Sequence, residues 1–197
     1  MKQYKNNKNN TLLLRLASQD QRDRQKYIGN EAKVFRNDQK RRLKVAILLA
    51  QGKVRTGADC FSAALIYQHG SNLQDYLRAR TLARKAMSKG EEAGKWLYAA
   101  ATDRWLVRQG RKQKFGTQYC SVMDPIGSHA RRKRVMRISP YDKRTSDKTR
   151  ARFHVPPLSK LLAMQESYTK QFCGEGRGVH PDSPTRRGSN ESRKPAS

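Results

Sequence analysis

The sequence predicts a mainly α-helical fold, a compact bundle of roughly five or six helices built from antiparallel helical hairpins. Three observations favour it. Residues 59–118 contain three helix-length segments, closed by Gly70, Gly90 and Gly110. Apolar side chains recur in these segments at the spacing of one helix face. The connections between the segments are short, which implies antiparallel neighbours.

The pattern changes after Gln109. Residues 110–157 show no helical period, whereas Val135–Ser139 alternates between apolar and polar side chains as a short strand does. We therefore expect an irregular segment over about 110–157, with room for a short β-hairpin. This segment is expected to wrap over the helices.

Two more helices are expected on the N-terminal side. Thr11 can cap a first helix, which Gly29-Asn30 interrupts. A second helix is strongest over Asn37–Gln51, with Asn37 as its N-cap. Its apolar residues recur at i, i+3, i+4 and i+7, at Leu43, Ala46, Ile47 and Ala50.

The remaining helix boundaries follow from capping residues. Asp59 is expected to cap the third helix, and the fourth begins after Ser71-Asn72. The fifth runs from about Glu91 to Gln109. Pro156-Pro157 opens the last helix, because proline is tolerated in a first turn.

The expected domain organisation is simple. Residues 11–172 are long enough for a single helical domain with its own core. Residues 1–10 are rich in lysine and asparagine and are expected to be a disordered basic arm. Residues 173–197 are rich in glycine, proline, serine and arginine and are expected to be a disordered tail.

Charge is the strongest compositional signal. The chain has 43 Lys and Arg against 16 Asp and Glu, a formal net charge of +27. The excess belongs to the folded region, since residues 1–58 carry +11, residues 59–125 carry +5 and residues 126–170 carry +9. A field of this size attracts nucleic acid or another polyanion such as an anionic membrane or an acidic protein. The alternative is a general bias toward solubility with no specific partner.

The cysteines and histidines argue against several classes of protein. Cys60, Cys120 and Cys173 are odd in number and far apart, which is typical of reduced thiols in a cytoplasmic protein and not of a disulfide framework. The four histidines lack zinc-ligand spacing: His69, His129, His154 and His180. We expect no metal, no cofactor and no membrane span.

Asp103 stands out on the fifth helix. Its neighbours at helical spacing are all apolar: Trp96, Ala99, Ala100 and Val107. The carboxylate therefore falls on a packing face, where it must be paired or neutral. Arg104 is next in sequence but points about 100° away. A partner from another helix is required; Gln68 or His69 is preferred, with Arg24 and Arg42 as alternatives.

His69 lies at the C-terminal end of the third helix, where the helix dipole favours a protonated imidazole. An Asp103–His69 pair could serve as a general-base unit. The same residues could instead line a ligand pocket, or form a buried polar tie that fixes helix packing. No nucleophile is specified, so all three interpretations stay open.

Gly116-Thr117-Gln118 forms a third polar cluster in a loop. A Gly-Thr turn can present backbone N–H groups to an anion, and nearby Arg111, Lys112 and Lys114 add positive charge. The segment lacks the glycine and lysine spacing of a P-loop. It is expected to close over the helix ends beside Asp103 and His69.

Taken together, the motifs resemble a large, mostly bacterial family of uncharacterised proteins, a domain of unknown function. They are DQxxR at residues 20–24, QHG at 68–70, DR at 103–104, GxxQKFGTQ at 110–118 and a D..R....VPPL segment from 147. The resemblance covers roughly residues 16–168. It implies a helical body with a polar site and supplies no activity.

The resemblance also carries a set of polar site residues onto this chain. They are Asp20, Arg24, Gln68, His69, Asp103, Arg104, Gln113, Gly116, Thr117, Gln118, Asp147 and Arg150. Two features depart from the family pattern: Phe115 replaces the commoner tyrosine, and the chain is far more basic than many members.

A second resemblance covers residues 63–97, which look like one Sel1-type, tetratricopeptide-like helical hairpin. About three such repeats are needed for a solenoid, so this resemblance implies a hairpin and, by analogy, a binding scaffold.

Two functional hypotheses follow. The first is a non-catalytic binding or scaffold protein whose basic surface contacts nucleic acid. The alternative is a small enzyme, hydrolytic or otherwise, that uses His69 and Asp103 as an acid/base pair. Whether the polar cluster is open or filled by neighbouring side chains discriminates between them.

Overall fold

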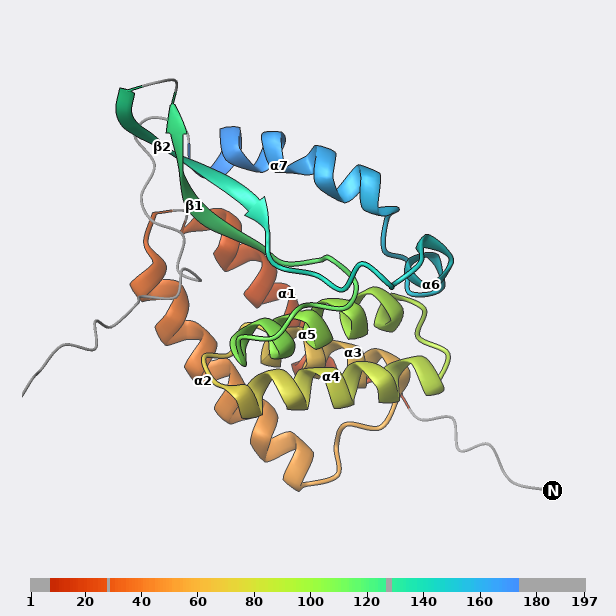
Figure 1. Ribbon diagram of the computed structural model, residues 1–197. Helices are drawn as coiled ribbons and strands as arrows, with labels where there is room; N and C mark the ends of the chain where they lie inside the picture. The colour runs from red at the N-terminus through yellow and green to blue at the C-terminus, as the bar shows by residue number, and fades with distance from the viewer. Residues whose placement is uncertain (1–7, 28, 127–128, 174–197) are drawn as a thin grey trace, which may run out of the picture.

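The computed structural model describes residues 8–27, 29–126 and 129–173. Within these residues the chain forms seven helices and one two-stranded sheet (Figure 1), which confirms the mainly α-helical prediction. The elements are α1 (Thr11–Lys26), α2 (Glu31–Ala50), α3 (Gly57–Tyr67), α4 (Leu73–Ser88), α5 (Ala93–Arg108), β1 (Tyr119–Ile126), β2 (His129–Ile138), α6 (Asp147–Arg152) and α7 (Leu158–Cys173).

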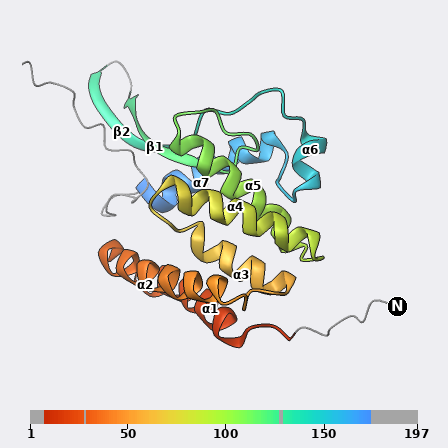
Figure 2. The ribbon, with the colours of Figure 1, turned by 90° about the horizontal axis from the view of Figure 1, so that it is seen from below.

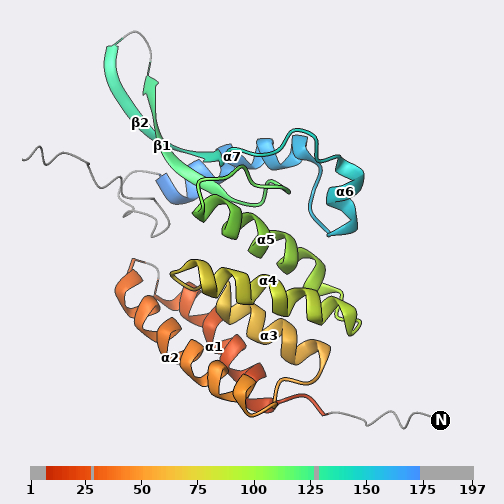
Figure 3. The ribbon, with the colours of Figure 1, turned by 60° about the horizontal axis from the view of Figure 1, so that its bottom comes forward.

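The helices stack in layers, as Figures 2 and 3 show. The α1–α2 pair forms one outer layer, α3 and α4 follow, and α5 separates them from α6, α7 and the sheet. The main apolar core lies among α1 to α5. Its fully buried side chains include Leu13, Val45, Ile66, Ala83 and Leu97.

Helix α5 is covered on two sides. Leu97 and Ala101 belong to the main core. Ala99 faces a second, smaller core that contains Phe115, Val155 and Leu161. Small side chains on α5 let both neighbours approach closely, and this double coverage explains why a carboxylate on this helix is buried.

The expected hairpin in the 110–157 segment is present and is longer than the short strand expected at Val135–Ser139. β1 and β2 pair antiparallel and project as a ribbon beyond the helical body (Figures 1 and 3). Helix α7 covers the outer edge of β2, where Gln165 Oε1 accepts from Ile138 N at 2.8 Å and Thr169 Oγ1 accepts from Met136 N at 2.9 Å.

The second helix differs most from its prediction. α2 begins at Glu31 with Asn30 as its N-cap, so Asn37 lies inside the helix. Leu43 and Ile47, expected to face the core, are 67% and 57% exposed. The pattern was misleading because the inward face of α2 is half charged. Its buried residues are Asp38, Arg41, Val45 and Leu48.

Capping also differs in detail. Asn10, not Thr11, caps α1. Thr56 caps α3, and Asp59 is the third helical residue of a capping box, in which the two side chains each accept from the other's backbone N–H. Helix α6 lies in a segment expected to be irregular, which raises the helix count above five or six.

The predicted arm and tail lie largely outside the described residues, in 1–7 and 174–197. Asn10 is described, and its backbone N–H donates to Asp59 Oδ1 at 2.7 Å. The N-terminal end of the described chain is thereby tied to α3.

Candidate functional site

The polar positions predicted from sequence are brought together. They form one connected set of hydrogen bonds and neighbouring residues that runs from α1, through the end of α3 and α5, to the 113–118 loop and α6. Within this set, Asp103 and His69 have partners other than those expected. Their actual partners determine what the site can do.

Asp103 is fully buried, as the register of α5 predicted. Its Oδ1 accepts from the backbone N–H of Lys114 at 2.7 Å and of Phe115 at 2.9 Å. Its Oδ2 accepts from the backbone N–H of Thr117 at 2.9 Å and from the Thr117 hydroxyl at 2.8 Å. Both oxygens are therefore occupied by donors from one loop, and Asp103 fixes the shape of that loop.

The expected partner of Asp103 was wrong. Among the described residues, its hydrogen-bond donors all come from the 114–117 loop and none is Gln68, His69, Arg24 or Arg42. Burial raises the pKa of Asp103, and the hydrogen bonds from Phe115, Thr117 and Lys114 oppose that rise. Each oxygen already accepts two hydrogen bonds, so the carboxylate has no free lone pair with which to take a proton from a substrate.

His69 is paired with a different carboxylate, Asp20 on α1. The ring Nδ1 lies 2.9 Å from Asp20 Oδ2, and Arg24 Nε lies 3.1 and 3.2 Å from the two ring nitrogens. Because Nδ1 faces a carboxylate it carries the hydrogen, and Nε2 is left to accept from Arg24. The neutral imidazole thus satisfies both neighbours.

Burial, reinforced by the nearby charges of Arg24 and Arg104, lowers the pKa of His69 despite its contact with Asp20. Burial would raise the pKa of Asp20, but the hydrogen bond from His69 and the charges of Arg24 and Arg41 outweigh it and lower that pKa. The pair is therefore a neutral imidazole beside an ionised carboxylate. This agrees with the tautomer and differs from the protonated His69 expected from the helix dipole.

Arginines surround the carbonyl end of α3. Arg104 Nη1 donates to the carbonyl of Gln68 at 2.7 Å, and its Nε donates to Gln118 Oε1 at 3.2 Å. Arg42 Nη1 donates to the carbonyl of His69 at 3.0 Å. These guanidiniums complete the open end of the helix and link α2, α5 and the loop to it.

The loop is braced by Gln113, which is completely buried. Its Oε1 accepts from Gln118 N at 2.8 Å, and its Nε2 donates to the carbonyls of Gln118 and Ser139. Gly116 has φ of +91°, and a Cβ there would lie 3.1 Å from Leu161 and 3.2 Å from Ile138. Glycine is required at this position by both backbone conformation and space.

Arg150 anchors the far side of the same loop. It is 1% exposed, and its Nε donates to the carbonyl of Phe115 at 3.0 Å. Its Nη1 donates to the Thr145 carbonyl and to Asp147 Oδ1. Asp147 Oδ1 also accepts from Leu158 N, which joins α6 to the start of α7.

Sequence reasoning missed the ionic layer around Asp20, in which Arg24 lies 3.4 Å and Arg41 3.6 Å from Asp20 itself. Arg41 lies 2.7 Å from Asp23 and 2.6 Å from Asp38, while Arg24 lies 2.9 Å from Asp38. The available signal was a second helical row on α2, Asp38, Arg41, Val45 and Leu48, facing the polar continuation of α1. Leu43 and Ile47 are exposed because the row with Asp38 and Arg41 is the one that faces α1.

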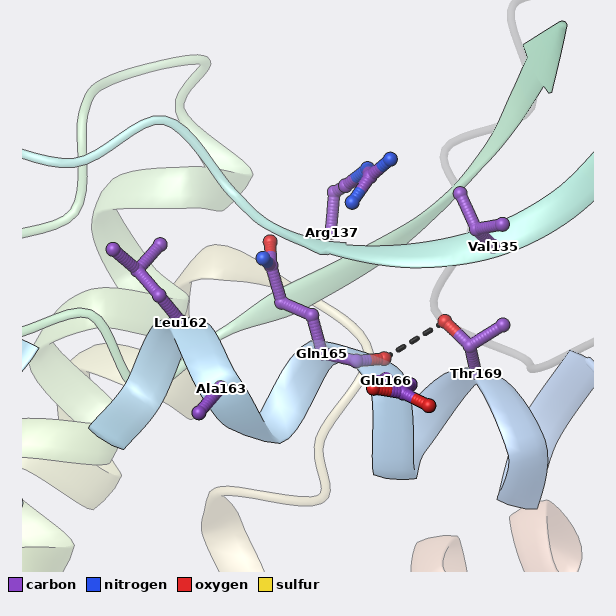
Figure 4. A pocket seen from close by; sticks show the side chains of 7 residues that line it. All are labelled: Val135, Arg137, Leu162, Ala163, Gln165, Glu166 and Thr169. Atoms are coloured by element: carbon purple, nitrogen blue, oxygen red, sulfur yellow. Dashed lines mark hydrogen bonds between the residues drawn. The ribbon is translucent and has the colours of Figure 1, made fainter. Parts of the chain in front are cut away.

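Two surface hollows lie away from this network. One, of about 320 Å³, lies between β2 and α7, where Arg137, Gln165 and Thr169 line it with their neighbours (Figure 4). The other, of about 280 Å³, lies between α1 and α3 and is lined by residues such as Leu14, Phe61 and Leu65. Neither is lined by His69 or Asp103.

The comparison with known proteins gave no match to a family model, to a curated protein or to a solved structure. The resemblance to an uncharacterised family stays a prediction from motifs. Within the described residues no three His, Cys, Asp or Glu side chains are grouped to hold a metal ion, and no helix is long and apolar enough to cross a membrane.

Proposed function

We propose that this protein is a non-catalytic binding protein that docks on nucleic acid through its basic surface. The observation that carries the proposal is a separation of charge between interior and exterior. Among the described residues, five aspartates are buried. Only two basic side chains are buried, those of Arg41 and Arg150. The carboxylates serve the interior, so the surface is more positive than the net charge of +27 alone implies.

The buried aspartates have internal partners that explain their placement. Asp59 accepts from the backbone N–H groups of Asn10, Arg55 and Thr56. Asp75 accepts from Ser71 N and lies 3.4 Å from Arg42. These carboxylates are held inside by their partners, so the charged groups that meet solvent are mostly lysines and arginines. A polyanion with regularly spaced phosphates is the partner that such a surface attracts most strongly.

The polar network supports a structural role in preference to the acid/base alternative. Asp103 has both oxygens filled by loop donors, and His69 has both nitrogens in contact with Asp20 and Arg24. Neither residue lines either of the two hollows described above. The network instead holds the helical body and the loop as a rigid base for surface contacts.

The test is a direct binding measurement with salt titration. Fluorescently labelled mixed-sequence DNA and RNA, single- and double-stranded, are titrated with the full chain at several salt concentrations. We expect affinity to fall steeply as salt rises, because each phosphate contact releases a counterion. Absence of binding at low salt, or affinity that does not change with salt, overturns the proposal.

A further inference from the structure

We infer that the β1–β2 ribbon is the element that contacts nucleic acid, and that its partner is duplex DNA entered through the major groove. The inference rests on the proposed nucleic-acid function and names the surface and the class of nucleic acid. It is carried by the projection of the ribbon, by its dimensions and by the cations exposed on it.

The ribbon is held firmly at its base. Tyr119 Oη donates to the carbonyl of Leu161 at 2.7 Å, and Tyr119 packs edge-on against Tyr168 with ring centroids 4.7 Å apart. Thr169 holds the backbone of Met136, and Gln165 holds that of Ile138. From this base the two strands project away from the helical body (Figures 1 and 3). An element anchored at one end and projecting at the other can reach into a groove.

The dimensions of the ribbon select the partner. Paired strands lie about 4.8 Å apart, and the major groove of B-form DNA, about 12 Å wide, admits a two-stranded ribbon. The major groove of A-form RNA is too deep and narrow for side chains to read. A projecting ribbon therefore fits duplex DNA better than duplex RNA.

The exposed cations lie where such a groove requires them. Lys133 and Arg134 are both exposed, and because they are consecutive in a strand they point to opposite faces of the ribbon. Asp124 is the acidic residue of β1, and it is ion-paired with Arg137 on β2. Asp124 also lies directly opposite Lys133 in the strand pairing, and its ion pair with Arg137 offsets its charge. Lys133 and Arg134 thus place one cation on each face of an element that two phosphate backbones would flank.

A second row of cations provides a matched comparison. Arg36, Lys40 and Lys44 recur at i, i+4 and i+8 on the exposed side of α2, next to the exposed Leu43 and Ile47. This row lies along one convex helix and mixes charge with apolar surface. It can touch one phosphate backbone at most, so it is expected to contribute less to duplex binding.

The test compares two variants with the same loss of charge. Lys133→Gln with Arg134→Gln removes two cations from the ribbon, and Arg36→Gln with Lys40→Gln removes two from α2. All four side chains are exposed, and thermal melts verify that both variants remain folded. For a mixed-sequence duplex of about 20 base pairs near 0.1 M salt, we expect the ribbon variant to bind about tenfold more weakly or worse and its salt slope to drop by about two.

Two controls sharpen the result. Lys133→Arg with Arg134→Lys keeps both charges and is expected to bind as the unchanged protein does. Dimethyl sulfate methylates guanine N7 in the major groove, so bound protein is expected to protect N7, and the ribbon variant is expected to lose that protection at the same concentration.

The outcomes separate this inference from the proposed function. Binding to no nucleic acid overturns both. Salt-dependent binding that prefers RNA, that leaves guanine N7 unprotected, or that the α2 variant weakens as much as the ribbon variant does, overturns the ribbon inference and leaves the proposed function standing.

Discussion

Asp20 and Asp103 are both fully buried, yet the protein neutralises them in opposite ways. Asp103 accepts from uncharged donors of one nearby loop. Asp20 accepts from His69 and lies 3.4 Å from Arg24 and 3.6 Å from Arg41. The pKa of Asp103 is raised and that of Asp20 is lowered. One carboxylate shapes a loop, whereas the other is part of an ionic layer between helices.

This difference predicts how much stability the protein loses when each aspartate is removed. The donors of Asp103 lie 11 to 14 residues away in the chain and have no other acceptor among the described hydrogen bonds. The cations around Asp20 keep Asp23 and Asp38 as partners if Asp20 is removed. Unsatisfied buried donors cost more than a partner lost from a shared ionic network.

The largest effect is therefore expected for Asp103→Ala. It leaves three backbone N–H groups and one hydroxyl without an acceptor in a buried site, and we expect unfolding free energy to fall by about 4 kcal/mol. Urea denaturation followed by the fluorescence of Trp96 and Trp105, both on α5, measures the loss. Asp142→Asn, at a half-buried surface carboxylate paired with the exposed Arg144, is the control and is expected to change the midpoint little. A loss below about 1 kcal/mol for Asp103→Ala would contradict the structural role.

The next largest effect is expected for Asp20→Ala. Removing the carboxylate leaves His69, Arg24 and Arg41 with one anion fewer in a buried layer, and we expect a loss of about 3 kcal/mol. The two variants are also expected to loosen different regions of the protein. Hydrogen exchange is expected to quicken in α1 and α2 for Asp20→Ala and in the 113–118 loop for Asp103→Ala. The same pattern of exchange in both variants would remove the distinction.

The sequence predicted where the long helices lie and that Asp103 is buried, but it did not predict the partners of the two aspartates. Helical period and capping residues located the long helices, and the apolar neighbours of Asp103 predicted its burial. The partners were not predictable, because they depend on how the chain folds back: Asp103 meets a loop whose donors are backbone N–H groups that every sequence carries. On α2, two different rows of side chains have helical spacing. The apolar row with Leu43 and Ile47 was predicted to face the core, but it is exposed, and the row with Asp38 and Arg41 is buried instead.

A smaller effect is expected at Arg104, which links the two regions. Arg104→Met keeps the length of the side chain but removes the donors to the Gln68 carbonyl and to Gln118 Oε1. We expect a loss of about 1 to 2 kcal/mol by urea denaturation, since the Gln68 carbonyl can also turn to water. The comparison variant is Arg108→Met, whose contact with the Ser71 carbonyl is 3.5 Å and exposed. Equal losses for the two variants would show that Arg104 does not join the regions.

The smallest expected effect is on the pH dependence of stability, because the ionisable groups of the two regions have pKa values shifted in opposite directions. A carboxyl with a raised pKa, such as Asp103, contributes stability below its unfolded pKa that is lost as pH rises through its folded pKa. Asp20, whose pKa is lowered, contributes stability above its unfolded pKa that is lost as pH falls through its folded pKa. His69 follows the second pattern: its pKa is lowered, so its contribution is present above about 6.5 and is lost on acidification.

Melting temperature measured between pH 7.5 and pH 5 tests this sign. We expect it to fall on acidification because the folded state holds His69 neutral, and a pKa difference of one is worth about 1.4 kcal/mol; we expect His69→Gln to flatten the curve. His154→Asn is the control, since His154 is half-exposed on α6's C-terminal side with φ of 56°, which asparagine tolerates. Its curve shows what the loss of an imidazole outside this network does to the melting temperature. A His69→Gln curve as steep as that of the parent protein would mean that the pKa of His69 does not differ between the folded and unfolded states, which would contradict its lowered pKa in the folded protein.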